Sequence, residues 1–295
     1  MEGILKRAQE LAADLQPWPG YFAAKAYELQ AVARFCGIPE GGKVLEVGCG
    51  HGFTAVLLSD TASSVVALDL PAANLATHSS GIDAAELLLT RLGKSNVKLV
   101  GGTVEAMPFP DKSFDIIFSS YALNYVRKRD KALSEMRRVL DDNGVVITLV
   151  PNFMERIFTP IILYEYLVGQ VIRRATACAE PKAGRIRTDT GKKSKRALFD
   201  KIIVKADGPY RGSVHEMMEH RPSSWKRLFG SNGFKVVNTF SASLLPVGIF
   251  DLLGPCSVRM IAKVLFSANQ ALGSSAVAKR FCYSLGIKAI KDKHS

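Results

Sequence analysis

The chain has 295 residues, of which 47% are apolar, and its 39 Lys and Arg outnumber its 27 Asp and Glu to give a net charge of +12. This length can bury one large core, or one core with a smaller lobe. We expect no membrane-spanning helix, because no uncharged apolar run reaches roughly 18 residues. The five cysteines are scattered and the first residues lack a signal-peptide core, so we expect a cytoplasmic protein without a metal site.

Apolar periodicity predicts helices over 1–16 and 21–36, followed by a regular alternation of strands and helices. The expected strands cover 43–48, 64–69, 97–101, 114–119 and 145–150, and the expected helices cover 53–59, 82–92 and 129–139. This alternation is typical of parallel strands joined by right-handed crossovers. After a tight turn at 141–144 and the fifth strand, we expect a helical segment at 153–172, a loop rich in Lys and Arg, a helix at 223–229 and an edge strand at 233–237.

The first predicted strand breaks into glycines at alternate positions, Gly48, Gly50 and Gly52. Glycines here let a ligand approach the backbone, and the free N–H groups that follow can bind polar groups. The spacing differs from the G-x-G-x-x-G pattern of dinucleotide sites. Asp69 closes the second strand, where a carboxylate can accept both hydroxyls of a ribose. The two features together predict a nucleoside ligand at the carboxyl edge of the sheet.

Several segments in this order resemble class I S-adenosylmethionine-dependent methyltransferases, in the branch that includes the menaquinone and ubiquinone C-methyltransferases and many small-molecule methyltransferases. They are residues 46–52, Asp69, 107–115, 135–140 and Gly144. The resemblance covers residues 40–152, with a weaker match at 224–237. It implies an α/β, Rossmann-like, doubly wound and mostly parallel seven-stranded sheet, with 233–237 as its antiparallel edge.

The resemblance implies S-adenosyl-L-methionine as the cofactor and assigns its contacts residue by residue. Glu46 would face the α-amino group of the methionine part, and Asp69 the ribose. Thr103 stands where similar enzymes carry an acid and would contact the adenine amino group less strongly, beside the backbone N–H of Val104. The full set of expected cofactor residues is Glu46, Gly48, Cys49, Gly50, Gly52, Asp69, Leu70, Thr103, Val104 and Ser119.

Three residues are candidates for the acceptor side. His220 precedes the helix before the edge strand, where related enzymes often carry a histidine, and is a candidate general base or substrate contact; an ordinary surface histidine is the alternative. Asn124 and Tyr125 follow the fourth strand and are candidates for the lining of the acceptor pocket, with core packing as the alternative. His215 and His220 are five residues apart, so they do not share a helix face as zinc ligands, and we predict no metal.

The positive charge is concentrated in two segments. Residues 173–205 carry a net charge of +8 and residues 259–295 a net charge of +6, so the rest of the chain has a net charge of −2. This pattern favours a methyltransferase that acts on a lipid-like or amphiphilic small molecule at an anionic membrane surface. A soluble O- or N-methyltransferase for a small metabolite, an RNA or protein methyltransferase, and a non-catalytic scaffold are the alternatives. Nucleic acid is disfavoured, since Phe199 is the one aromatic residue available for base stacking in 173–205.

The predicted organisation has five parts, and the sequence gives no indication of an oligomeric state. They are N-terminal helices that cap the cofactor site (1–36), the S-adenosylmethionine-binding core (37–152), a helical and basic insertion that serves as a substrate lid or membrane contact (153–214), a segment that completes the core sheet (215–250), and a basic helical tail (251–295).

Overall fold

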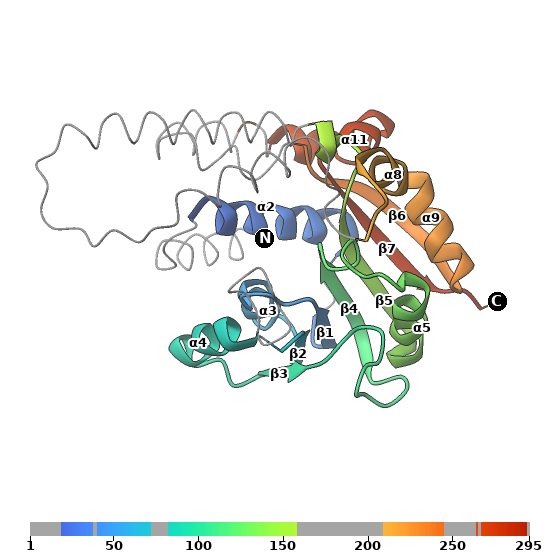
Figure 1. The fold of residues 1–295 in the computed structure, drawn as a ribbon. Helices are drawn as coiled ribbons and strands as arrows, with labels where there is room; N and C mark the ends of the chain where they lie inside the picture. Colours follow the sequence, from blue (N-terminus) through green and yellow to red (C-terminus); the bar gives the residue numbers. More distant parts are fainter. Residues whose placement is uncertain are drawn as a thin grey trace, which may run out of the picture.

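The computed structural model of the chain describes residues 19–37, 40–71, 82–157, 209–244, 264 and 267–293. Its centre is a seven-stranded sheet with the order β3-β2-β1-β4-β5-β7-β6 (Figure 1). The strands are β1 (Lys43–Val47), β2 (Ser64–Asp69), β3 (Val97–Gly101), β4 (Phe114–Ser120), β5 (Leu140–Pro151), β6 (Phe234–Ser243) and β7 (Ser284–Lys291). The helices are α2 (Pro19–Cys36), α3 (Phe53–Leu58), α4 (Ile82–Leu92), α5 (Arg129–Val139), α8 (Ser213–Glu219), α9 (Pro222–Ser231) and α11 (Ala276–Phe281).

Strands β1 to β5 pair in parallel, and the strand order reverses between β1 and β4. Open α/β sheets bind their ligands at such a switch point, beyond the carboxyl ends of the strands. The glycine turn after β1 and the end of β4 both lie there. The mostly parallel sheet, the antiparallel pairing at one edge and the Rossmann-like architecture are therefore confirmed.

The antiparallel strand is β7, which lies between β5 and β6 and pairs antiparallel with both. The prediction that 233–237 is the antiparallel strand was wrong in this detail: β6 is the edge strand, but it runs in the same direction as β5. The segment predicted as a basic helical tail, 251–295, contains helix α11 but also strand β7, which the prediction did not include. The sequence did not predict β7 as a strand because lysines interrupt its apolar pattern. Its residues Leu285, Ile287 and Ala289 are nevertheless fully buried at alternate positions, as in a strand.

Two apolar clusters cover the two faces of the sheet. On one face, α2 and α3 pack against the sheet through residues such as Leu29 and Val56. On the other face, α5 and α9 pack through residues such as Met136 and Phe229. Alternation along β5 supplies both faces, since Ile147 belongs to the first cluster and Val146 to the second. A parallel sheet buried on both faces needs such apolar strands, and this is the pattern that the sequence shows.

Most predicted boundaries lie within two residues of the observed ones, and β5 and β6 are the exceptions. Strand β6 continues to Ser243, six residues beyond its predicted end. Strand β5 starts early. It begins at Leu140, so residues 141–144 belong to an irregular start of the strand, where the register shifts between Phe114 and Ile116. The predicted helix 1–16, most of the segment 153–172 and the basic stretch 173–205 lie outside the described residues. No described helix is long and apolar enough to cross a membrane.

Candidate active site

The turn from β1 into α3 presents open backbone at one glycine. Gly48, Gly50 and Gly52 all have positive φ, at 77°, 52° and 75°, which favours glycine. A Cβ on Gly48 would lie 2.4 Å from the Ala122 Cβ, and one on Gly52 would lie 2.9 Å from the Ala85 Cβ. At Gly50 no atom lies within 4 Å of such a Cβ. Gly48 and Gly52 thus allow close packing, while Gly50 leaves room for a ligand.

The carboxylate of Asp69 lies against this turn. Its Oδ2 accepts a hydrogen bond from the Gly50 N–H at 2.6 Å, and its Oδ1 accepts one from the Leu70 N–H at 2.7 Å. These bonds orient the carboxylate and leave each oxygen a lone pair for a further donor. A ribose diol presents two such donors, so the geometry fits the predicted role of Asp69.

Glu46 is a buried acid with an incomplete set of partners. Its side chain is 2% exposed, and it interacts with the Thr54 side chain and the Ala55 backbone at the start of α3. Its Oε2 has no hydrogen-bond partner among the described residues. Burial raises the pKa of Glu46 well above its usual range, Asp69 raises it further, and Lys25 opposes the shift. A buried carboxylate of this kind gains from a cationic ligand group, so the site fits the ammonium of the methionine part.

Helix α2 is fastened to the end of β4 beside this acid. The Lys25 Nζ donates to the Glu28 Oε2 at 2.9 Å and to the Ser120 Oγ at 2.8 Å. The Tyr121 hydroxyl donates to the Glu28 Oε1 at 2.7 Å, from a backbone with φ of 57°. Ser119 is fully buried, and its Oγ has no hydrogen-bond partner among the described residues. The sequence reasoning missed Lys25 and Glu28, whose signal is an i, i+3 pair of opposite charges in the middle of a largely apolar helix.

The remaining predicted cofactor residues surround the same edge of the sheet. Thr103 is exposed just beyond β3, and its Oγ1 accepts a long hydrogen bond of 3.3 Å from the Glu105 N–H. Val104 and Cys49 are buried, at 9% and 6% exposed, and the Cys49 N–H donates to the Leu68 carbonyl oxygen at 3.3 Å. Burial raises the pKa of the Cys49 thiol, which therefore stays protonated.

Comparison with known proteins agrees with this geometry. Residues 45–148 match the family model described as "Methyltransferase domain". The ubiquinone/menaquinone biosynthesis C-methyltransferase UbiE of Haemophilus ducreyi is 30% identical over 213 residues, which cover 70% of this chain and 70% of that protein. The chain belongs to the S-adenosylmethionine-dependent methyltransferases. Its cofactor is accordingly S-adenosyl-L-methionine, as the resemblance implied.

A protein of Aspergillus luteorubrus named "Probable methyltransferase ltbC" is 33% identical over 58% of this methyltransferase, and the match spans 59% of the relative's own length. A crystal structure of an S-adenosylmethionine-dependent methyltransferase from Thermotoga maritima has a TM-score of 0.51 at 17% identity, and the match covers 93% of this chain and 92% of that one. At this identity the structural likeness shows the fold alone.

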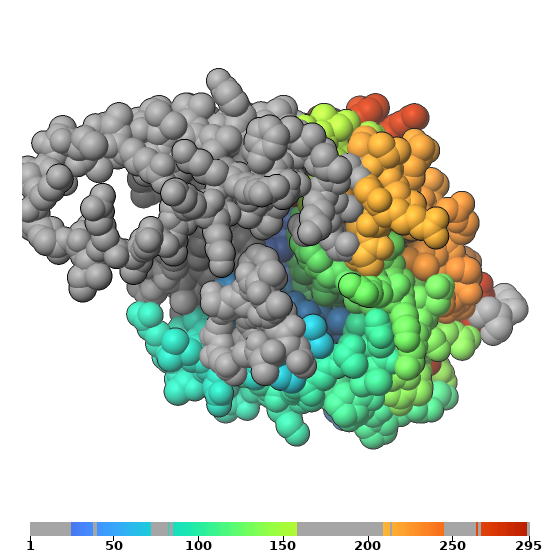
Figure 2. Space-filling model, in the orientation of Figure 1, coloured from blue at the N-terminus to red at the C-terminus, as the bar shows by residue number. Residues whose placement is uncertain are grey.

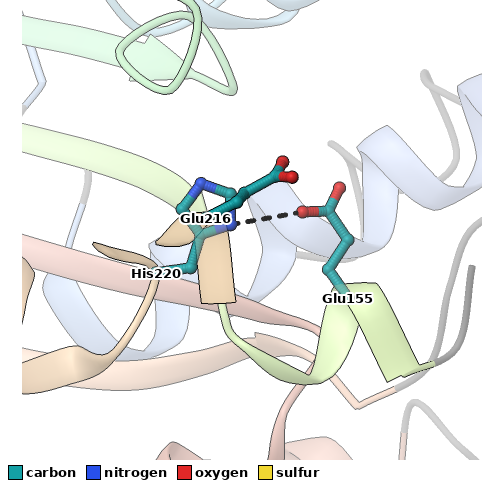
Figure 3. A group of neighbouring side chains, drawn as sticks. All are labelled: Glu155, Glu216 and His220. Atoms are coloured by element: carbon teal, nitrogen blue, oxygen red, sulfur yellow. Dashed lines mark ion pairs between the residues drawn. The ribbon is translucent and has the colours of Figure 1, made fainter. Parts of the chain in front are cut away.

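The methyltransferase buries His220 completely, at the carboxyl end of α8. Its Nε2 lies 2.8 Å from the Tyr210 hydroxyl, and its ring stacks on Trp225. Figure 3 shows its contact with Glu155, in which the His220 Nδ1 lies 3.6 Å from the Glu155 Oε2. Burial, with help from Arg129 and Arg156, lowers the pKa of His220 to about 3. The imidazole is therefore neutral, and its conjugate acid is strongly disfavoured. The alternative of an ordinary surface histidine was wrong, while the role of general base stays a prediction.

Tyr210 links His220 to the loop that follows β4. The Tyr210 hydroxyl donates to the Asn124 carbonyl oxygen at 3.0 Å and contacts the Arg129 guanidinium, which also donates to the Leu123 carbonyl at 3.2 Å. This network holds the loop at Leu123 and Asn124, directly before Tyr125. Asn124 is 4% exposed and its Oδ1 has no partner among the described residues, whereas Tyr125 is 54% exposed. Their predicted place in the acceptor pocket remains a prediction, and the sequence reasoning missed Tyr210 and Arg129.

Glu155, Glu216 and His220 bring potential metal-ligand atoms within 4.8 Å of one another (Figure 3). Arg156 forms an ion pair with Glu216, so a fixed guanidinium already lies beside this carboxylate. His215 lies outside the cluster and is exposed. The absence of a metal remains a prediction, and the ion pair with Arg156 supports it.

Proposed function

We propose that the protein transfers a methyl group from S-adenosyl-L-methionine to a small amphiphilic acceptor. The observation that carries this proposal is the open backbone at Gly50, between the anchored carboxylate of Asp69 and the unpartnered buried Oε2 of Glu46. These groups match a ribose and an ammonium group, and they are held on the rigid ends of β1 and β2.

Bound S-adenosyl-L-methionine supplies a methyl group that its sulfonium already activates. The chain then has to orient the two reactants in line and exclude water, and positioning of this kind can contribute roughly 7–11 kcal/mol. In the proposed arrangement Asp69 holds the ribose, Glu46 holds the ammonium group, and α2 closes the site through Lys25. The loop 121–125, held by Arg129 and Tyr210, borders the acceptor.

An amphiphilic acceptor is supported by two observations. The relative from Haemophilus ducreyi is named for ubiquinone and menaquinone biosynthesis, and quinones of this kind are lipid-like small molecules. The net charge of +12 is concentrated outside the catalytic core, which suits a protein that works on an anionic membrane surface from the cytoplasmic side. If the acceptor is instead a soluble small metabolite, the methylated product is found in the aqueous phase and not in the organic phase.

The experiment is methylation of lipid and aqueous extracts by the purified protein with a labelled methyl donor, followed by mass spectrometry of both phases. We expect label in an organic-phase product with the wild type and none with Asp69→Ala. Asp60→Ala is the matched control, since Asp60 is an exposed acid paired with Lys94. Label in the aqueous phase alone would contradict the amphiphile, and label with Asp69→Ala equal to wild type would contradict the site.

A further inference from the structure

A groove of about 680 Å³ lies between α9, α11 and the segment that follows β5, away from the cofactor site. Figure 1 shows α8, α9 and α11 together at the end of the sheet where β5 finishes, and in Figure 2 the orange surface of residues 209–244 adjoins red atoms of the 267–293 segment. The groove is lined by Phe153, Arg221, Pro222, Ser223, Lys226, Thr239, Ala276, Lys279, Arg280 and Phe281.

The lining carries four cations and no acid: Arg221, Lys226, Lys279 and Arg280. None of the four forms an ion pair within the part of the chain that the structure describes. Among the described residues, therefore, no acidic side chain neutralises their positive charge. Unpaired cations gathered around a concave surface favour a multiply anionic partner.

Apolar side chains accompany these cations. The Phe281 and Phe153 ring centroids lie 6.3 Å apart, and the Arg280 guanidinium lies 5.9 Å from the Phe281 centroid. Phe281 is 50% exposed and Val277, on the same short helix α11, is 69% exposed. Cations beside exposed aromatic and aliphatic groups match an interface with phosphate headgroups on one side and acyl chains on the other.

We propose that this groove is the surface through which the protein docks on bilayers of anionic phospholipid, with headgroup phosphates between Lys226 and Arg280 and with Val277 and Phe281 at the acyl boundary. This inference rests on the proposed function in one respect: an enzyme that methylates amphiphiles needs a surface that contacts the membrane, and the groove would be that surface. Docking itself needs neither the methyl donor nor the acceptor, so the two proposals fail separately.

The test is flotation of the full chain with vesicles of phosphatidylcholine, with and without phosphatidylglycerol, in the absence of methyl donor. We expect the wild type to float with the anionic vesicles and to be released by salt. Removal of one cation weakens binding to an anionic membrane roughly fivefold, so Lys226→Gln/Arg280→Gln should weaken it roughly 25-fold. Val277→Ser/Phe281→Ser should weaken it without any change of charge.

The matched control is Arg91→Gln/Lys131→Gln, which removes the same charge from exposed positions on α4 and α5 and should bind as the wild type does. Circular dichroism melts establish that every variant is folded. No flotation of the wild type, or equal weakening in the groove variant and the control, would overturn the proposal. Calorimetry with S-adenosyl-L-methionine on the same preparations shows separately whether the cofactor site is intact.

Discussion

At the scale of single residues, the acids at the strand ends could be read from the sequence, whereas their partners could not. Glu46 and Asp69 follow apolar runs and lie where the motif predicts. Lys25 meets Ser120 across 95 positions, and Tyr210 meets Arg129 across 81, so no local pattern connects them. Such contacts depend on the packing of α2 and of the segment before α8, which a single sequence does not specify.

The pKa of Glu46 predicts that cofactor affinity depends on pH. Because burial raises this pKa well above its usual range, the free protein holds Glu46 protonated as the pH falls, and a cationic ligand favours the ionised form. Affinity for S-adenosyl-L-methionine should therefore rise with pH through the raised pKa, with uptake of the ligand coupled to release of a proton. Calorimetry in buffers of different ionisation enthalpy measures both.

Glu46→Gln should remove this pH dependence and the proton release, and should bind the ligand more weakly at high pH. An unchanged pH profile in Glu46→Gln would assign the dependence to another group. The effect of pH on stability has the opposite sign. Because the folded-state pKa of Glu46 is raised, protonation of Glu46 favours folding, and this contribution to stability is lost as pH rises through the folded pKa.

His220 predicts a loss of stability in acid. Its folded-state pKa of about 3 lies below the unfolded value of 6.5, so protonation favours the unfolded chain as the pH falls below 6.5. Urea denaturation from pH 7 to pH 4 should show the free energy of unfolding falling less steeply in His220→Gln than in the wild type. The variant His215→Gln, at an exposed position, is the control and should follow the wild-type slope.

At the scale of elements, the alternation of strands and helices predicted the core almost residue for residue, and β7 is where it failed. Parallel strands buried on both faces give uniform apolar runs, which a sequence reveals directly. Strand β7 instead mixes Lys288 and Lys291 with Gly286, and its neighbour β6 lies 40 or more residues earlier in the chain. Its pairing depends on tertiary packing against β5 and β6, which the apolar periodicity of a sequence does not reveal.

The close approach of the Phe240 ring explains why strand β7 has a glycine at position 286. A Cβ there would lie 2.1 Å from the Phe240 ring on β6, so Gly286→Ala should destabilise the protein by about 1–3 kcal/mol through overpacking. Phe240→Leu should cost stability by itself but should recover part of the loss in the double variant. Additive losses in the double-variant cycle, measured by urea denaturation, would show that the ring is not the obstacle.

The ion pair of Arg156 and Glu216 fastens α8 to the segment after β5. Both side chains are largely buried, at 11% and 2% exposed, so Glu216→Gln breaks a buried ion pair by removing one of its two charges and should cost about 3–5 kcal/mol. A chelator should leave the melting temperature of the wild type unchanged. A fall in melting temperature on chelation, restored by a divalent cation, would show instead that the cluster of Glu155, Glu216 and His220 holds a metal.

At the scale of the whole molecule, the two proposed functions belong to separate places around one sheet. We propose that its carboxyl edge at β1, β2 and β4 binds the cofactor and that the groove at α9 and α11 meets the membrane. The first follows from the family and from the geometry at Gly50, Glu46 and Asp69. The second is inferred from the charge of +12 together with the four cations of the groove, because the described residues that line it include no acid.

The most direct test of the central claim is isothermal titration calorimetry of the intact protein with S-adenosyl-L-methionine and with its demethylated product. We predict saturable binding of both by the wild type, weakened roughly 10- to 100-fold in Asp69→Asn, since a hydrogen bond to a charged group is worth about 1.5–3 kcal/mol. Folded wild-type protein that binds neither molecule, or an Asp69→Asn variant that binds them as tightly as the wild type, would contradict it.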